Sequence, residues 1–208
     1  LGKLDKTFSG DRKEVRRKQM PIAQFMGASL IEKVKEIEVA VINGGSVRSS
    51  LNKGNVSRKD LHTLHPYGNT IVSVKLSAED FFKYIQVTSK INIIAQNISE
   101  GGNPHYINMR LTYKNKVLSS IEAKNKSWKV FIDKKGRVHS TKKSFVLGTM
   151  NFLARGGDNY PIITDKKSYI DTGFMINAAM MDYLEKYKVI KANTFEKLSK
   201  GILIFKWD

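Results

Sequence analysis

The chain has 208 residues, of which 41% are hydrophobic and 10% aromatic, so it can bury the core of one domain and is too apolar for a disordered chain. It has 36 Lys and Arg against 19 Asp and Glu, for a net charge of +17, and no Cys, which excludes disulfides and thiolate metal sites. It contains no run of about 18 apolar residues, which excludes a helical membrane span.

The first half of the chain alternates helical and strand patterns. Apolar spacing predicts a helix over 20–37, a buried strand over 38–42, a helix over 57–65, a strand over 70–76 and a helix over 77–87. Pro21 suits the first turn of the first helix. Ser57 with Asp60, and Ser77 with Asp80, have the spacing of capping boxes, which predicts the starts of the next two helices.

In the second half, period-two patterns dominate. They predict strands over 106–113, 117–123, 128–132 and 144–150, followed by a helix over 174–187, a short helix that ends near 199, and a closing strand over 202–207. Helices and strands interleave, but several strands follow one another directly. This order predicts an α+β fold, a single domain with a mixed β-sheet and flanking helices.

Four polar loops at strand ends are candidates for a ligand site. Their sequences are NGGSVR (43–48), HPYGN (65–69), GGNP (101–104) and NFLARGGDNYP (151–161). Glycine pairs let the backbone approach a ligand closely. Taken singly, the first two loops favour an ordinary turn, and the third indicates neither a turn nor a site.

The last of these loops carries the clearest signal. Phe152 lies beside a Gly-Gly-Asp turn, so we expect its ring near the surface, where it can stack on a flat heterocycle. Asp158 can accept hydrogen bonds from sugar hydroxyls, and Tyr67 can supply a second ring on the opposite side. Such stacking is worth about 1–3 kcal/mol for each ring.

Three arginines are candidates for binding an anion. Arg12 and Arg16 are four residues apart, so they share a face if the segment is helical. Together with Arg48 they can form a cradle for a phosphate or carboxylate. The alternative is an exposed helical turn with solvated arginines, which is the commoner structure for such a segment taken alone.

The positive charge and the histidines give weaker signals. The lysines are spread along the chain without a run of five basic residues, so we expect solvated lysines and do not expect nucleic acid as a partner. His62 and His65 have a usable metal spacing, but only Asp60 lies near them, and surface or capping roles are favoured. Since no nucleophile motif is present, we expect a binding domain without catalytic residues.

Taken together, the loops resemble one known family. NGGSVRSSLNKGNVSRKDLHTLHPYGNT and MNFLARGGDNYP are similar, in order, to the asparagine/glycine-arginine, aromatic-x-Asn and Gly-Gly-Asp segments of the 5′-nucleotidase C-terminal domain. GDRKEVR and DTGFMINAAMMDYL are similar to segments of its bacterial UDP-sugar hydrolase/5′-nucleotidase branch. The resemblance runs from about residue 10 to about residue 206.

The resemblance implies a four-layer α/β/β/α arrangement and makes residues 1–208 the nucleotide-binding domain of a two-domain phosphohydrolase. Two divalent metal ions are then expected in an N-terminal metallophosphoesterase domain that this chain lacks, and none in this domain. By position, Phe152 and Tyr67 become the stacking rings and Asp158 the ribose ligand. The base and sugar are assigned to Asn69, Asn43 and Gly101, and the phosphate to Arg12, Arg16 and Arg48.

Because the chain opens without Met, we expect a fragment of a longer protein, and the resemblance implies a periplasmic, extracellular or cell-surface location. Four features depart from the family pattern: Met20–Ala23 after the arginines, Tyr67 in place of Phe, Asn159 in place of Gly, and a long segment over 88–100. The last makes the position of Gly101 the least certain match.

Four functions remain open from the sequence. The first is the substrate-binding domain of a 5′-nucleotidase, which should bind adenosine or AMP and hydrolyse neither alone. The second is the same domain in a 2′,3′-cyclic-nucleotide phosphodiesterase/3′-nucleotidase. The third, of another class, is a non-enzymatic basic domain that binds nucleic acid. The fourth is a stand-alone small-ligand binder derived from the enzyme domain.

Overall fold

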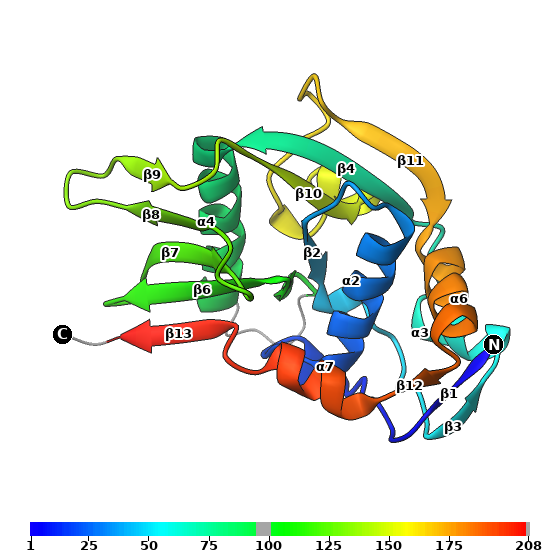
Figure 1. Cartoon of the computed structure of the whole chain (residues 1–208). Helices are drawn as coiled ribbons and strands as arrows, with labels where there is room; N and C mark the ends of the chain where they lie inside the picture. Colours follow the sequence, from blue (N-terminus) through cyan, green and yellow to red (C-terminus); the bar gives the residue numbers. More distant parts are fainter. Residues whose placement is uncertain (95–100, 207–208) are drawn as a thin grey trace.

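Two five-stranded sheets form the frame of the molecule (Figure 1). The computed structural model describes residues 1–94 and 101–206. Its helices are α1 (Arg12–Val15), α2 (Pro21–Lys33), α3 (Arg58–Leu64), α4 (Ala78–Ile94), α5 (Asn151–Ala154), α6 (Ile176–Tyr187) and α7 (Ala192–Ser199), with short 3₁₀ turns η1 (Gly44–Ser46) and η2 (Gly157–Asn159). Within these residues, no helix is long and apolar enough to cross a membrane.

The strands divide among three sheets. The central sheet has the order β11 (Ile170–Met175), β4 (Thr70–Ser77), β10 (Ser144–Met150), β2 (Val39–Asn43), β5 (Pro104–Ile107). The second has the order β13 (Leu203–Lys206), β6 (Met109–Lys114), β7 (Val117–Ala123), β8 (Lys129–Ile132), β9 (Val138–Ser140). A small third sheet joins β12 (Val189–Ile190), β1 (Gly2–Leu4) and β3 (Gly54–Val56).

The central sheet is mixed, because β10 runs parallel to β2 while the other neighbours are antiparallel. Every residue of β2 is buried, as expected for an apolar strand with neighbours on both sides and helices over its face. Helix α2 packs on β2 and β5 and against α6 and α7. The candidate loops lie at the ends of these strands: 43–48 and 151–161 follow β2 and β10, and 65–69 and 101–104 lead into β4 and β5.

Helix α4 lies between the two large sheets, which Figure 1 shows from the side. Its Phe81 stacks on Phe145 of β10, with ring centroids 4.5 Å apart, and meets Trp128, next to β8, at 6.0 Å. Helices therefore flank the central sheet, with α4 against β4, β5 and β10 and α2 against β2 and β5. Apolar side chains on several faces of α4 let the helix contact the second sheet as well.

The fold class predicted from the sequence, a single domain with mixed sheets and flanking helices, is confirmed. The capping box of α3 is present, with the amide of Asp60 donating to Ser57 Oγ at 3.2 Å and the amide of Ser57 donating to Asp60 Oδ2 at 2.8 Å. Ser77 Oγ accepts from the amide of Asp80 at 3.1 Å, which confirms the predicted start of α4.

Several predicted boundaries are wrong. The helix predicted over 20–37 ends at Lys33, and the helix predicted over 77–87 continues to Ile94. The strand predicted over 106–113 breaks at Asn108, whose φ of 63° turns the chain from β5 in the central sheet to β6 in the second. Residues 174 and 175 belong to β11 and not to the helix after it. The short strands β1, β3, β9, β11 and β12 were not predicted, and residue 207 of the closing strand lies outside the described residues.

Candidate functional site

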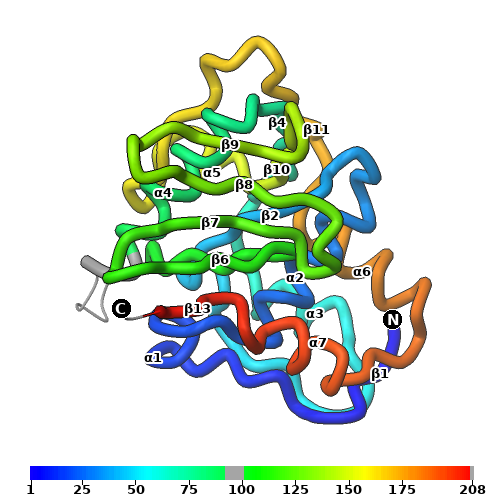
Figure 2. The backbone as a smooth tube through the Cα atoms, turned by 60° about the vertical axis from the view of Figure 1, so that its left-hand side comes forward, coloured from blue at the N-terminus to red at the C-terminus, as the bar shows by residue number. Residues whose placement is uncertain are grey.

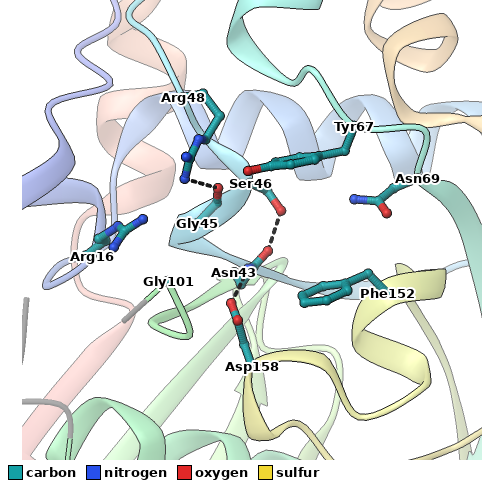
Figure 3. A pocket seen from close by; sticks show the side chains of 10 residues that line it. All are labelled: Arg16, Asn43, Gly45, Ser46, Arg48, Tyr67, Asn69, Gly101, Phe152 and Asp158. Carbon is teal, nitrogen blue, oxygen red and sulfur yellow. Dashed lines mark hydrogen bonds between the residues drawn. The ribbon is translucent and has the colours of Figure 1, made fainter. Parts of the chain in front are cut away.

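A cavity of about 240 Å³ opens at the ends of the central strands (Figure 3). Typical small-ligand pockets are somewhat larger, about 300–1,000 Å³. The structure brings most of the predicted site residues together in its wall: Arg16, Asn43, Arg48, Tyr67, Asn69, Gly101, Phe152 and Asp158. Gly45 and Ser46 also line it and were missed, whereas Arg12 is not among the lining residues.

Two aromatic rings lie on opposite sides of this cavity (Figure 3). Tyr67 comes from the loop between α3 and β4, and Phe152 from α5, directly after β10. They are 42% and 45% exposed, so neither ring is a core residue, as expected for Phe152. The buried ring of His65 meets Tyr67 edge to face at 5.4 Å and supports it from behind. A flat heterocycle can therefore enter between two rings held from different loops.

The Gly-Gly-Asp turn supports Phe152 from below. A Cβ on Gly157 would lie 2.5 Å from the Cε1 and Cζ atoms of Phe152, so only glycine leaves the ring in this position. Gly156 and Asp158 have φ values of 94° and 53°, in the left-handed region. Asp adopts this conformation more readily than most residues other than glycine, so the turn can place the Asp158 carboxylate at the cavity without severe strain.

A chain of hydrogen bonds orients the polar side of the cavity (Figure 3). Ser46 Oγ donates to Asn43 Oδ1, and Asn43 Nδ2 donates to Asp158 Oδ2 at 2.5 Å. Ser46 thus determines which way the Asn43 amide points, and the amide in turn holds the carboxylate in place. A carboxylate has a second oxygen, which can accept hydrogen bonds from a pair of hydroxyl groups.

His65 links three parts of the site. Its Nδ1 lies 3.0 Å from the carbonyl of Ser46, and because a carbonyl only accepts, the proton belongs on Nδ1. Nε2 is then an acceptor and faces Nδ2 of Asn69 at 3.5 Å. Burial lowers the pKa of His65, which favours this neutral form.

His62, the other histidine of the HxxH spacing, is exposed, in contrast to the buried His65. Nδ1 of His62 lies 3.2 Å from Nδ2 of Asn177, which also donates to the carbonyl of His65 at 2.9 Å. The described residues contain no group of three or more His, Asp or Glu placed to hold a metal ion. His62 and His65 each have a hydrogen-bond partner at the C-terminal end of α3.

Arginines make one end of the cavity positively charged. Arg16, which caps α1, is only 6% exposed, and burial followed by the charges of Arg12 and Arg48 lowers its pKa. Arg48 is exposed, donates to the carbonyl of Gly45 at 3.5 Å and has its guanidinium 5.8 Å from the ring centre of Tyr67. Arg12 is exposed on α1, close enough to act on Arg16 electrostatically. An anion at this end would meet at least two guanidinium groups.

Buried hydrogen bonds anchor the backbone just before Arg16. The carbonyl of Val15 accepts from Asn103 Nδ2 at 3.1 Å and from His105 Nε2 at 2.8 Å. Burial lowers the pKa of His105 to about 4. A Cβ on Gly44 would lie 2.3 Å from the same carbonyl, so the glycine allows α1 to approach the end of β2 closely.

Gly101 forms part of the wall through its backbone. Its carbonyl accepts from the amide of Gly45 at 2.7 Å, and a Cβ on Gly101 would lie 2.9 Å from Gly45 Cα. The long segment noted before it, 88–100, begins as the last turns of α4, while residues 95–100 lie outside the described residues. The position predicted for Gly101 therefore does lie in the cavity wall.

The chain matches known proteins in sequence over nearly its whole length. The family model for the 5′-nucleotidase C-terminal domain matches residues 1–165. Protein UshA of Yersinia enterocolitica is 28% identical over 206 residues, which are 99% of this chain and 34% of that protein. The 5′-nucleotidase of Vibrio cholerae is 28% identical over 194 residues, 93% of this chain and 31% of that protein. A trifunctional nucleotide phosphoesterase of Bacillus subtilis is 25% identical over 198 residues, which are 89% of this chain and 13% of that protein.

Solved structures show the same fold. The 5′-nucleotidase precursor of Thermus thermophilus superposes with a TM-score of 0.77 at 20% identity, over 99% of this chain and 39% of that one. The NAD nucleotidase of Haemophilus influenzae superposes with a TM-score of 0.76 at 18% identity, over 100% of this chain and 38% of that one. The chain spans about a third of the length of the UshA and Vibrio relatives. On the match of the family model to residues 1–165, the chain belongs to the 5′-nucleotidase C-terminal domain family.

Proposed function

We propose that this chain holds a nucleotide by its nucleoside part and presents the phosphate to a two-metal site in another domain of the same protein. One observation supports this above the others. Two exposed rings, Tyr67 and Phe152, lie across a single cavity that has a carboxylate on one side and guanidinium groups at its end. Base, ribose and phosphate are the three chemical groups that such walls would recognise together.

Different residues of the cavity bind the base, the ribose and the phosphate in this proposal. The base stacks between Tyr67 and Phe152, and the ribose hydroxyls donate to Asp158, which Asn43 holds in place. The remaining polar groups of the wall, Asn69 and the Gly101 backbone, lie beside the base and the sugar. The phosphate lies towards Arg16 and Arg48, with Arg12 adding positive potential from outside the cavity.

The chemistry is divided between domains. The resemblance implies two divalent metal ions in the other domain, which when bound would supply an activated water and stabilise the charge on the phosphate. The residues of this chain contribute orientation, because a base and ribose held at fixed points restrict where the phosphate can lie. Binding energy from the nucleoside is thereby used to align the reacting group.

Titration calorimetry of the purified chain with adenosine and AMP tests the binding step. Phe152→Ala and Tyr67→Ala should each weaken binding about 5- to 140-fold, which corresponds to about 1–3 kcal/mol. Phe174→Ala and Tyr187→Ala are matched controls, since these rings are 46% and 44% exposed but lie outside the cavity wall, and they should bind normally. Equal losses in the controls would reject the stacking role.

Activity measurements test the division between domains. The chain alone, with Mg²⁺, Mn²⁺ or Zn²⁺ added, should hydrolyse no AMP, and metal-dependent hydrolysis would refute the proposal. In the complete protein, comparing 5′-AMP, a 2′,3′-cyclic nucleotide and a UDP-sugar identifies which phosphoesterase reaction the cavity serves. A thermal-shift screen of nucleosides and nucleotides with the chain alone ranks the bases independently of catalysis.

We also propose that the complete protein acts outside the cytoplasm, in the periplasm or at the cell surface, as the resemblance implies. Cell fractionation with antibodies against this chain, beside a cytoplasmic marker enzyme, tests the location. Recovery of the protein with the cytoplasmic marker would contradict it.

A further inference from the structure

Half of the net positive charge lies on the second sheet. Residues 109–143 carry 11 Lys and Arg against two acidic residues, whereas the other 173 residues carry 25 against 17. A lysine-rich composition alone would spread the excess evenly. These basic residues form no run of five, but they gather in one stretch of the sequence, and that stretch forms β6–β9 and their connecting turns.

One face of this sheet is open. Burial alternates along β6, so that Leu111 and Tyr113 point inward, while Thr112 is half-buried and Lys114 is exposed on the other side. Helix α4 covers the inner face, and Figure 2 shows β9, β8, β7, β6 and β13 side by side across the front of the molecule. The register places Lys206 of β13 beside Lys114, so two like charges sit together at this face.

The carboxylates of the sheet reduce its positive charge only in part. Glu122 pairs with Arg110 at 3.2 Å, and Asp133 pairs with Arg137 at 3.0 Å. The strands and turns also carry exposed lysines in larger number, at positions 114, 116, 126, 129, 134, 135 and 143. A surface with this excess attracts an extended anion more strongly than a single small one.

An aromatic pair lies among these lysines. Phe131 of β8 and His139 of β9 are directly opposite each other, and their rings stack with centroids 5.1 Å apart and planes 17° apart. Phe131 is 39% exposed, and Lys129 is two positions before it on the same face of β8. Rings on an open sheet with a basic surround are how many proteins bind single-stranded nucleic acid, with bases on the rings and phosphates on the lysines.

We propose that the outer face of the second sheet binds a single-stranded polynucleotide. None of the residues that line the nucleotide cavity lies on β6–β9 or β13, so the two sites are separate. An anionic membrane would also be attracted by the lysines, but it gives no role to the exposed stack of Phe131 on His139. A bound polymer would bring its breakdown products close to the cavity after a nuclease has cut it.

Fluorescence anisotropy with a labelled single strand of about 20 nucleotides tests the proposal on the longest natural form of the protein. The double variant Lys114→Glu/Lys129→Glu should lose at least about tenfold in affinity and show a shallower dependence of log Kd on log salt. The control Lys53→Glu/Lys59→Glu makes the same charge change at exposed positions away from the sheet and should lose less than about twofold.

The aromatic contribution has its own measurement. Phe131→Ala should weaken binding about fivefold or more while leaving the salt dependence unchanged, because stacking releases no counterions. Phe174→Ala is the control ring. Saturating adenosine should leave oligonucleotide binding intact. Competition by adenosine, equal losses in the Lys53/Lys59 control, or equally tight binding of anionic vesicles with no effect of Phe131→Ala would each overturn the proposal.

Discussion

Gly157→Ala tests whether the position of the Phe152 ring, and not merely its presence, determines binding. The new Cβ would lie 2.5 Å from Cε1 and Cζ and 2.7 Å from Cδ1 of the ring. Ordinary contact needs about 3.4 Å or more, so the ring must move by roughly 1 Å. Because Phe152 is 45% exposed, it can rotate into solvent, and we expect little loss of stability.

Once displaced, the Phe152 ring cannot lie flat against a base that is stacked between it and the ring of Tyr67. We therefore expect Gly157→Ala to lose much of one stacking interaction, about 1–2 kcal/mol, or about 5- to 30-fold in the Kd for adenosine. Titration calorimetry measures the Kd, and urea unfolding checks the stability. Gly68→Ala is the control, since a Cβ there would meet only Met175 Cε, at 3.9 Å.

A double-mutant cycle tests whether Gly157→Ala weakens binding through the Phe152 ring. In a Phe152→Ala background the added methyl of Gly157→Ala has no ring to displace, so it should cost little further binding. A full additional loss in that background would mean that Gly157 acts through Asp158 or the backbone turn. An unchanged Kd in the single variant would mean that the ring position is not critical.

Three further predictions concern the rest of the site. Ser46→Ala should weaken adenosine and AMP binding equally, about fivefold by calorimetry, because the Asn43 amide loses the donor that orients it; a loss confined to AMP would contradict this. Arg48→Ala should weaken AMP about tenfold and adenosine less than about twofold, and equal losses would argue against a phosphate role. The free energy of unfolding should fall by about 2 kcal/mol from pH 7 to 5, because unfolding raises the lowered pKa of His105 and so takes up a proton. His105→Gln should flatten that pH dependence in urea titrations, and an unchanged slope would refute the assignment.

The ring and turn residues could be predicted from the sequence because their signals are local. An aromatic residue beside Gly-Gly-Asp, or between Pro and Gly, is recognised from a few consecutive residues, without knowledge of the tertiary structure. Ser46 could not be predicted, because its role depends on the direction in which η1 turns its hydroxyl towards Asn43. The small third sheet was missed for a similar reason, since Gly2 pairs with Val56 and Lys3 with Val189, far away in the chain.

The basic surface also depends on pairings between strands that are distant in the sequence. Residues 114 and 206 are far apart in the sequence, and only the parallel pairing of β13 with β6 makes them neighbours. Counting runs of basic residues therefore gives no warning of a basic surface built from hairpins. Likewise, the layer order depends on α4 packing on two sheets, and the pattern of α4 identifies a helix without identifying its partners.

The second sheet is nearly continuous in sequence, since all of its strands except β13 come from one stretch between β5 and β10. The side chains of the cavity come from before and after that stretch. Substitutions on the outer face of the hairpins therefore change no residue of the cavity wall. Natural variation can alter the chemistry of this surface while the cavity wall stays the same.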